Sequence, residues 1–106
     1  MLHDPSNLLG QVKDALTRLY GDRLRGVYLY GSFARGDYDP ESDFDVLLVL
    51  DDFASYGGEV DRTGELAAKL SLEHSVSISL VFVREREWLT ADTPFLRNVR
   101  HEAIAA

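Results

Sequence analysis

The chain has 106 residues, of which 45% are hydrophobic, which is enough for one compact domain with a single core, expected to span residues 1–106. It has no cysteine, which excludes disulfides, cysteine–zinc sites and thiol nucleophiles, and its net charge of −7 argues against direct binding to nucleic acid, which needs a basic patch. Neither a long apolar run nor a basic amino terminus followed by a hydrophobic stretch is present, so we expect a cytoplasmic protein without a membrane span or secretion signal.

The first half of the chain predicts two helices and two strands. Asp4 followed by Pro5 is typical of a helix start, because aspartate caps the first turn and proline fits within it. The segment FDVLLVL is nearly continuously apolar, as expected of a strand that is covered on both faces. In chain order we expect a helix from Asp4 that carries Leu8, Leu9, Val12, Leu16 and Leu19, a strand over residues 25–30, a short helical turn over 33–36, a polar loop over 37–42 and a strand over 44–50.

The second half continues the same alternation. Charged residues and apolar residues with helical spacing predict an amphipathic helix over about residues 59–73, which carries Val60, Leu66, Ala67 and Leu70. Further on we expect a strand over residues 75–83 (SVSISLVFV), a short helical piece over 84–89, and a last helix from Thr93-Pro94 that carries Phe95, Leu96, Val99 and Ile104. Alternating helices and strands predict an α/β fold.

The segment GSFARGDYDPESDFD, residues 31–45, carries most of the chemistry. Asp43 and Asp45 lie two residues apart at the start of a strand, so their side chains share one face. Two carboxylates held side by side repel each other unless a cation neutralises them, and Mg²⁺ often takes one or two carboxylates plus substrate phosphates. The turn at Gly31 and Ser32 supplies the complement, because glycine lets backbone N–H groups and a following helix start approach an anion closely. Together these features predict nucleotide chemistry.

The same segment, read as G-S-x-A-R-G followed by S-D-x-D, resembles the signature of the nucleotidyltransferase superfamily related to DNA polymerase β. The matching residues are Gly31, Ser32, Ala34, Arg35, Gly36, Ser42, Asp43 and Asp45. The small size of the chain and the segment PFLRNVRHEAI make it similar to the minimal nucleotidyltransferases, which are commonly encoded beside a HEPN-domain toxin and act as its antitoxin. The resemblance implies a small nucleotidyltransferase fold, with a mixed β-sheet flanked by helices.

The resemblance also implies the roles of individual residues. Asp43 and Asp45 would be catalytic and would bind Mg²⁺ or Mn²⁺, and ATP would be the substrate. The expected reaction moves AMP from ATP to a tyrosine hydroxyl of a HEPN toxin, which is neutralised, and a hetero-oligomer with that toxin fits this expectation. The expected nucleotide-binding residues are Gly31 and Ser32 at the phosphates, Arg35 beside them, and Ser42, which orients the loop before Asp43.

The third carboxylate of that superfamily is missing. It usually sits on a neighbouring strand just before an apolar pair, and the best match here is Ser79, before Leu80 and Val81. A neutral hydroxyl is a weaker Mg²⁺ ligand than a carboxylate and a poor general base, and losing a general base costs roughly 10²–10⁴-fold in rate. The period of a strand puts Ser75, Ser77 and Ser79 on one face and Ile78, Leu80 and Phe82 on the other. The carboxylates that could take the place of the missing one are those of Asp37, Asp39, Asp51 and Asp52.

Three functions therefore stay open. The first is an active adenylyltransferase that modifies its toxin partner. The second, favoured by Ser79, is a catalytically impaired binding module that neutralises its partner by complex formation. The third function is transfer to a small molecule such as an aminoglycoside. It is ranked last, because the resembled enzymes carry an additional C-terminal domain for this reaction and none is expected in this chain.

Other conspicuous side chains receive structural interpretations. Tyr28, Tyr30 and Phe33 are expected in the core rather than against a nucleotide base. The three histidines lie far apart in the sequence and show no ligand spacing. A polar cluster near the end of the chain is interpreted as a solvated helix face, and it consists of Arg97, Arg100, His101 and Glu102.

Overall fold

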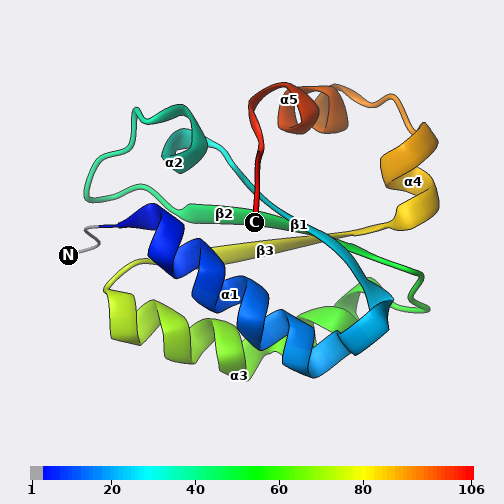
Figure 1. The fold of residues 1–106 in the computed structure, drawn as a ribbon, viewed down its shortest axis with the longest axis horizontal. Coiled ribbons are helices and arrows are strands. Elements are labelled where there is room, and N and C mark those ends of the chain that lie inside the picture. Colours follow the sequence, from blue (N-terminus) through cyan, green and yellow to red (C-terminus); the bar gives the residue numbers. More distant parts are fainter. Residues whose placement is uncertain (1–3) are drawn as a thin grey trace.

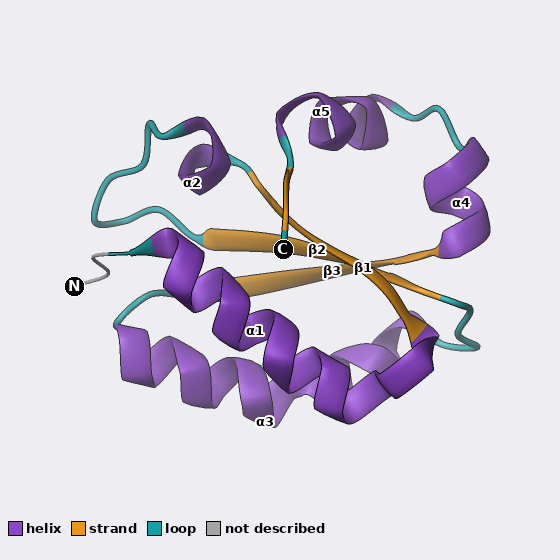
Figure 2. Ribbon diagram, viewed as in Figure 1, coloured by secondary structure: helices purple, strands orange, loops and turns teal. Residues whose placement is uncertain are grey.

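Four strands form one mixed sheet, and helices cover both of its faces (Figures 1 and 2). The computed structural model describes residues 4–106. The strands are β1 (Leu24–Tyr30), β2 (Phe44–Leu50), β3 (Ile78–Arg84) and β4 (Ile104–Ala105), in the spatial order β3-β2-β1-β4. β1 runs antiparallel to β2 and β4, whereas β2 and β3 are parallel. The predicted α/β fold with a mixed sheet is confirmed.

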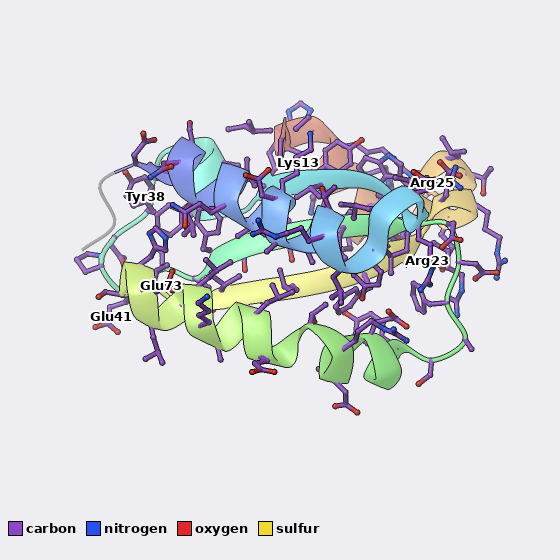
Figure 3. The ribbon with its side chains drawn as sticks, turned by 60° about the horizontal axis from the view of Figure 1, so that its bottom comes forward. Lys13, Arg23, Arg25, Tyr38, Glu41 and Glu73 are labelled. Atoms are coloured by element: carbon purple, nitrogen blue, oxygen red, sulfur yellow. The ribbon has the colours of Figure 1, made fainter. Side chains whose placement is uncertain are left out.

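Two long helices, α1 (Pro5–Tyr20) and α3 (Tyr56–His74), lie side by side on one face of the sheet (Figure 1). Their outer sides carry exposed charged side chains such as Lys13 and Glu73 (Figure 3). The shorter helical elements are η1 (Gly21–Arg23), α2 (Ser32–Arg35), α4 (Glu85–Thr90) and α5 (Pro94–Glu102). Of these, α4 and α5 lie on the other face of the sheet, and α2 directly follows β1 (Figure 1).

The starts of the long helices follow from their caps. The side chain of Asp4 accepts hydrogen bonds from the first turn of α1, as the sequence predicts. Helix α3 begins earlier than the predicted residue 59, because the hydroxyl of Ser55 accepts a hydrogen bond from the N–H of Gly58 at 3.1 Å. Gly57 and Gly58 have low helix propensity, and this hid the first turn from the sequence pattern.

Strand β2 is the centre of the core and is buried on both faces, as its apolar sequence predicts. One face, with Phe44, Val46 and Leu48, packs against α1 and α3. The other face, with Leu47 and Val49, packs against Leu96 and Val99 of α5. Period two therefore places the side chain of Asp45 on the face that α5 covers.

Strand β3 begins at Ile78, three residues later than predicted. Ser75 ends α3 in a left-handed conformation, with φ of 53°, so it cannot continue a strand. The prediction that one face of this strand carries Ile78, Leu80 and Phe82 is confirmed, and these side chains pack into the core beneath α1 and α3. Of the three serines, only Ser79 lies within the strand.

The end of the chain contains a strand that the sequence did not predict. Helix α5 stops at Glu102, and Ile104, which was expected on the helix, pairs with Leu29 of β1 as part of β4. A strand of two residues is too short to show any periodicity, so no sequence pattern predicts it. Among residues 4–106, no helix is both long enough and apolar enough to span a bilayer.

Candidate active site

Three side chains meet across the sheet beneath α5. In the register of the strands, Asp45 of β2 pairs with Tyr30 of β1 on one side and with Ser79 of β3 on the other. Residues paired in neighbouring strands point to the same face and lie close together. Ser79 therefore lies beside Asp45 on the same face of the sheet.

Asp45 lies where its negative charge is unfavourable. Burial raises the pKa of the Asp45 carboxyl above its ordinary value, and the neighbouring carboxylate of Asp43 raises it further. Burial and the charge of Asp45 also raise the pKa of Tyr30 to about 12, so its phenol stays neutral at pH 7. The repulsion between Asp43 and Asp45 is the property that a bound divalent cation would relieve.

Gly31 brings the backbone against the carboxylate of Asp45. β1 ends at Tyr30, and Gly31 takes a positive φ of 77° and caps α2, which begins at Ser32. A Cβ at Gly31 would overlap the Oδ2 atom of Asp45, so no side chain fits between the turn and the carboxylate. The glycine-serine turn is therefore adjacent to Asp45.

Glu102, at the end of α5, is a member of this site that the sequence analysis missed. One carboxylate oxygen, Oε2, accepts a hydrogen bond from the backbone N–H of Gly31 at 2.9 Å and another from Nη1 of Arg35 at 2.8 Å. The interpretation of Glu102 as part of a solvated helix face is therefore wrong, since its side chain is only 18% exposed. A signal existed, because a carboxylate in the last turn of a helix opposes the helix dipole and needs a donor or a cation nearby.

Arg35 is held between two carboxylates. Besides the bond to Glu102, its Nε atom lies 3.2 Å from Oδ2 of Asp37. The hydrogen bonds to Asp37 and Glu102 raise the pKa of Arg35 above its ordinary value. Asp37, one of the candidates to replace the missing carboxylate, is thus engaged with this arginine.

Ser42 closes the loop that precedes Asp43. Its hydroxyl accepts a hydrogen bond from the N–H of Asp39 at 3.0 Å, and its own N–H donates to the carbonyl of Asp39 at 3.1 Å. The carboxylate of Asp39 accepts from the N–H of Glu41 at 2.8 Å, so it stabilises the same turn. This geometry agrees with the orienting role expected of Ser42.

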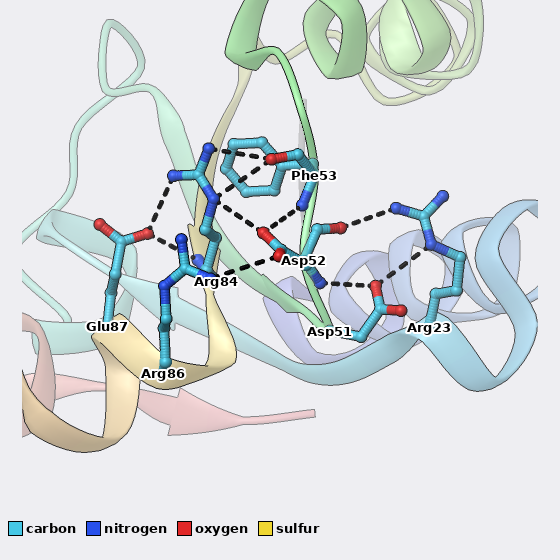
Figure 4. Close-up of polar contacts among 7 residues, drawn as sticks. All are labelled: Arg23, Asp51, Asp52, Phe53, Arg84, Arg86 and Glu87. Carbon is cyan, nitrogen blue, oxygen red and sulfur yellow. Dashed lines mark hydrogen bonds and ion pairs between the residues drawn. The ribbon is translucent and has the colours of Figure 1, made fainter.

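Asp51 and Asp52 lie at the opposite end of β2 from the site, six to seven residues beyond Asp45, or roughly 20 Å along a strand. Figure 4 shows them within a network of arginines, in which Asp51 pairs with Arg23 at 3.1 Å and Asp52 with Arg84 at 2.9 Å. The backbone N–H of Asp52 and the guanidinium of Arg23 lower the pKa of Asp51. Neither aspartate can replace the third carboxylate.

The residues that could hold a metal ion are thus Asp43 and Asp45. No group of three or more histidine, cysteine, aspartate or glutamate side chains suited to a metal occurs within residues 4–106. Two carboxylates fit Mg²⁺ when substrate phosphates and water supply its remaining ligands, because Mg²⁺ is usually bound in this way.

Comparison with known families shows the family to which the chain belongs. Residues 9–104 match the family model described as nucleotidyltransferase domain. The chain belongs to the nucleotidyltransferase domain family. Gly31, Ser32, Asp43 and Asp45 all fall within the matched range.

Two proteins of Methanocaldococcus jannaschii are similar to this nucleotidyltransferase domain over most of their length. The one named "Putative protein adenylyltransferase MJ0141" is 30% identical over 97 residues, which are 92% of this chain and 93% of that protein. The one named "Putative protein adenylyltransferase MJ0604" is 37% identical over 91 residues, which are 84% of each chain.

Solved structures share the fold of this nucleotidyltransferase domain. A chain in a crystal structure of a toxin-antitoxin with AMP-PNP matches with a TM-score of 0.63 and 23% identity, over 90% of this chain and 69% of that one. A chain in the complex of a tri-AMPylated Shewanella oneidensis HEPN toxin with its MNT antitoxin matches with a TM-score of 0.62 and 20% identity, over 96% and 71%. At these identities the likeness shows the fold alone.

Proposed function

We propose that this nucleotidyltransferase is an MNT-type antitoxin, which uses Mg²⁺ to transfer AMP from ATP to a tyrosine hydroxyl of a HEPN toxin and so neutralises it. The observation that carries the proposal is the close approach of the Gly31 turn to the carboxylate of Asp45, which would bring phosphates bound at the turn next to a cation bound by Asp43 and Asp45. The adenylyltransferase names of the M. jannaschii relatives and the toxin-antitoxin complexes among the similar structures support it.

The two residues of the turn, Gly31 and Ser32, would have different roles in binding the triphosphate. The N–H of Gly31 is bonded to Glu102, so Ser32 is left to contact the β- and γ-phosphates through its hydroxyl and its own N–H. Gly31 contributes by having no side chain where the phosphates would meet Asp45. Asp43 and Asp45 would hold Mg²⁺, which neutralises the charge that builds on the leaving pyrophosphate.

The transfer itself is an in-line displacement. The hydroxyl oxygen of the acceptor forms a bond to the α-phosphorus, and the bond from that phosphorus to the oxygen bridging to the β-phosphate breaks and releases pyrophosphate. The proton of the acceptor hydroxyl passes to solvent, because the neutral hydroxyl of Ser79 beside Asp45 does not act as a base. Positioning and electrostatics supply most of the catalysis in reactions of this kind.

The test is incubation of the purified protein with α-labelled ATP, Mg²⁺ and the product of the neighbouring gene. We expect label on a tyrosine of that partner, and loss of labelling when Asp43→Asn and Asp45→Asn are combined. The matched control combines Asp14→Asn with Asp61→Asn, which removes the same charge from exposed positions of α1 and α3. Normal labelling by the site variant would show that the site is wrongly assigned.

A second candidate function is a binding module that neutralises its partner without modifying it. The register that places Ser79 rather than a carboxylate beside Asp45 favours this function. The same incubation distinguishes the two, because a stable complex with an unlabelled partner supports the binding module and a labelled partner supports the enzyme.

A further inference from the structure

The carboxylate of Glu102 joins two parts of the site that are far apart in the sequence. Its Oε2 atom lies 2.9 Å from the N of Gly31, which is 71 positions away, and 2.8 Å from Nη1 of Arg35. Hydrogen bonds to an ionised carboxylate are about twice as strong as neutral ones. Because the side chain is 18% exposed, water screens these two bonds only in part.

Two features make this position unfavourable for a carboxylate. Glu102 is the last residue of α5, where the negative end of the helix dipole repels it. Its charge also helps to raise the pKa of Asp45, after the larger effects of burial and of Asp43. The bonds to Gly31 and Arg35 have to offset both effects, so the carboxylate is held at this place by these two donors.

The contact fixes the turn next to Asp45. Gly31 has a positive φ and no room for a Cβ against the Asp45 carboxylate, so a small rotation of this residue changes the distance between turn and carboxylate. Its N–H, which belongs to the peptide between Tyr30 and Gly31, donates to Glu102, and this bond sets the orientation of the peptide that leads into the turn. The same oxygen holds the guanidinium of Arg35 at the other end of α2.

We propose that Glu102 is a positioning residue of the nucleotide site, which holds the Gly31–Ser32 turn and Arg35 from α5 in the arrangement that receives the triphosphate. The inference rests on the proposed function, since it concerns the same nucleotide. Glu102 touches neither the phosphates nor the reacting atoms in this role, and it acts through Gly31 and Arg35.

Two measurements test the role. The first is amide hydrogen exchange at Gly31 in the protein without nucleotide, and the second is the affinity for AMP-PNP with Mg²⁺ by calorimetry. We expect Glu102→Ala to speed exchange at Gly31 by about tenfold or more and to weaken AMP-PNP binding by about tenfold, equivalent to about 1.4 kcal/mol. Glu102→Gln keeps an oxygen that can accept both hydrogen bonds, so it should restore most of the exchange protection and most of the affinity.

The matched control is Asp92→Ala, which removes the carboxylate that pairs with Arg97 on α5 at 3.1 Å and is exposed. It should leave both measurements unchanged. If Glu102→Ala does not fold, Glu102→Asp replaces it, because the shorter side chain keeps the charge but cannot reach both donors, and the same losses are expected.

The outcomes separate this inference from the proposed function. If Glu102→Ala binds AMP-PNP as tightly as the unaltered protein, the positioning role is overturned. Tighter binding overturns it too, because it would mean that Glu102 competes with the phosphates. If the unaltered protein does not bind AMP-PNP, the proposed function fails, and exchange at Gly31 then decides only the structural part of the inference, that Glu102 holds the turn. Faster exchange in Glu102→Ala supports it, and unchanged exchange overturns it.

Discussion

Ser79 lies directly beside Asp45, because the parallel pairing of β2 and β3 matches these two residues. A carboxylate at this position would lie beside Asp45, whose pKa burial and the charge of Asp43 already raise, and it would add a third negative charge to this pair. With serine there, the proposed site would have one metal ligand fewer than the superfamily pattern and no base next to the proposed acceptor. The reaction should therefore be slow rather than absent, since positioning and charge neutralisation remain.

Ser79→Asp should accelerate the transfer of AMP. Restoring a base and a metal ligand is expected to raise the turnover number by about tenfold or more, within the roughly 10²–10⁴-fold that a general base contributes. Ser77→Asp is the control, because Ser77 is exposed and precedes β3, and it should leave turnover unchanged. The measurement is single-turnover labelling of the partner. Equal rates for both variants would mean that position 79 plays no part in the chemistry.

Asp45→Asn should stabilise the fold while abolishing transfer. The pKa of Asp45 is raised in the folded protein, so this group favours folding at low pH, and the advantage is lost as the pH rises through its folded pKa. At pH 7 the ionised side chain thus destabilises the folded protein, and asparagine removes this charge. We expect a gain of about 0.5–2 kcal/mol in the free energy of unfolding. Urea unfolding at pH 7 and pH 4 checks the sign, because the gain should shrink at the lower pH.

Metal binding should depend on pH and on the nucleotide. With two carboxylates as the protein ligands, Mn²⁺ should bind weakly alone and more tightly with AMP-PNP, whose phosphates complete its coordination. Protonation of Asp45 begins at a higher pH than for an ordinary aspartate, so affinity should already fall under mildly acidic conditions. Electron paramagnetic resonance titrations of free Mn²⁺ measure both effects. Chelation with EDTA should stop the labelling of the partner.

Much of this site is local in sequence, and that part could be predicted. Gly31, Ser32, Asp43 and Asp45 lie within fifteen positions, and the nearly continuous apolar pattern of residues 44–50 predicted the strand that carries Asp45. Asp43 lies one residue before this strand and is exposed, so the shared face of the two aspartates stays a prediction. The predicted place of Ser79 also followed from period two, because Ile78, Leu80 and Phe82 identify the core face of β3.

The part that could not be predicted depends on distant contacts. Glu102 reaches Gly31 across 71 positions, and although its place in the last turn of α5 signals that it needs a donor, no local pattern identifies Gly31 and Arg35 as the donors. The pairing of Ile104 with Leu29 likewise depends on where α5 ends relative to β1. The assignment of Asp51 and Asp52 to the arginine network required the direction of β2 and the position of Arg84 on β3, which only the assembled sheet defines (Figure 4).

Gly31→Ala should damage the site and destabilise the protein. Alanine resists the φ of 77° at this position, and its Cβ would overlap the carboxylate of Asp45, so we expect a loss of about 1–3 kcal/mol in the free energy of unfolding. Gly10→Ala is the control within the same protein, because Gly10 lies on α1 with open space around it. There the substitution should stabilise by about 0.4–1 kcal/mol, since alanine reduces the freedom of the unfolded chain.

The two glycine variants also separate stability from binding. Gly31→Ala should lose AMP-PNP affinity even at a temperature where calorimetry shows it fully folded, because the turn can no longer approach Asp45. Gly10→Ala should bind normally. If Gly31→Ala binds AMP-PNP normally, the close approach of the turn to Asp45 is a packing feature, and the phosphates lie elsewhere.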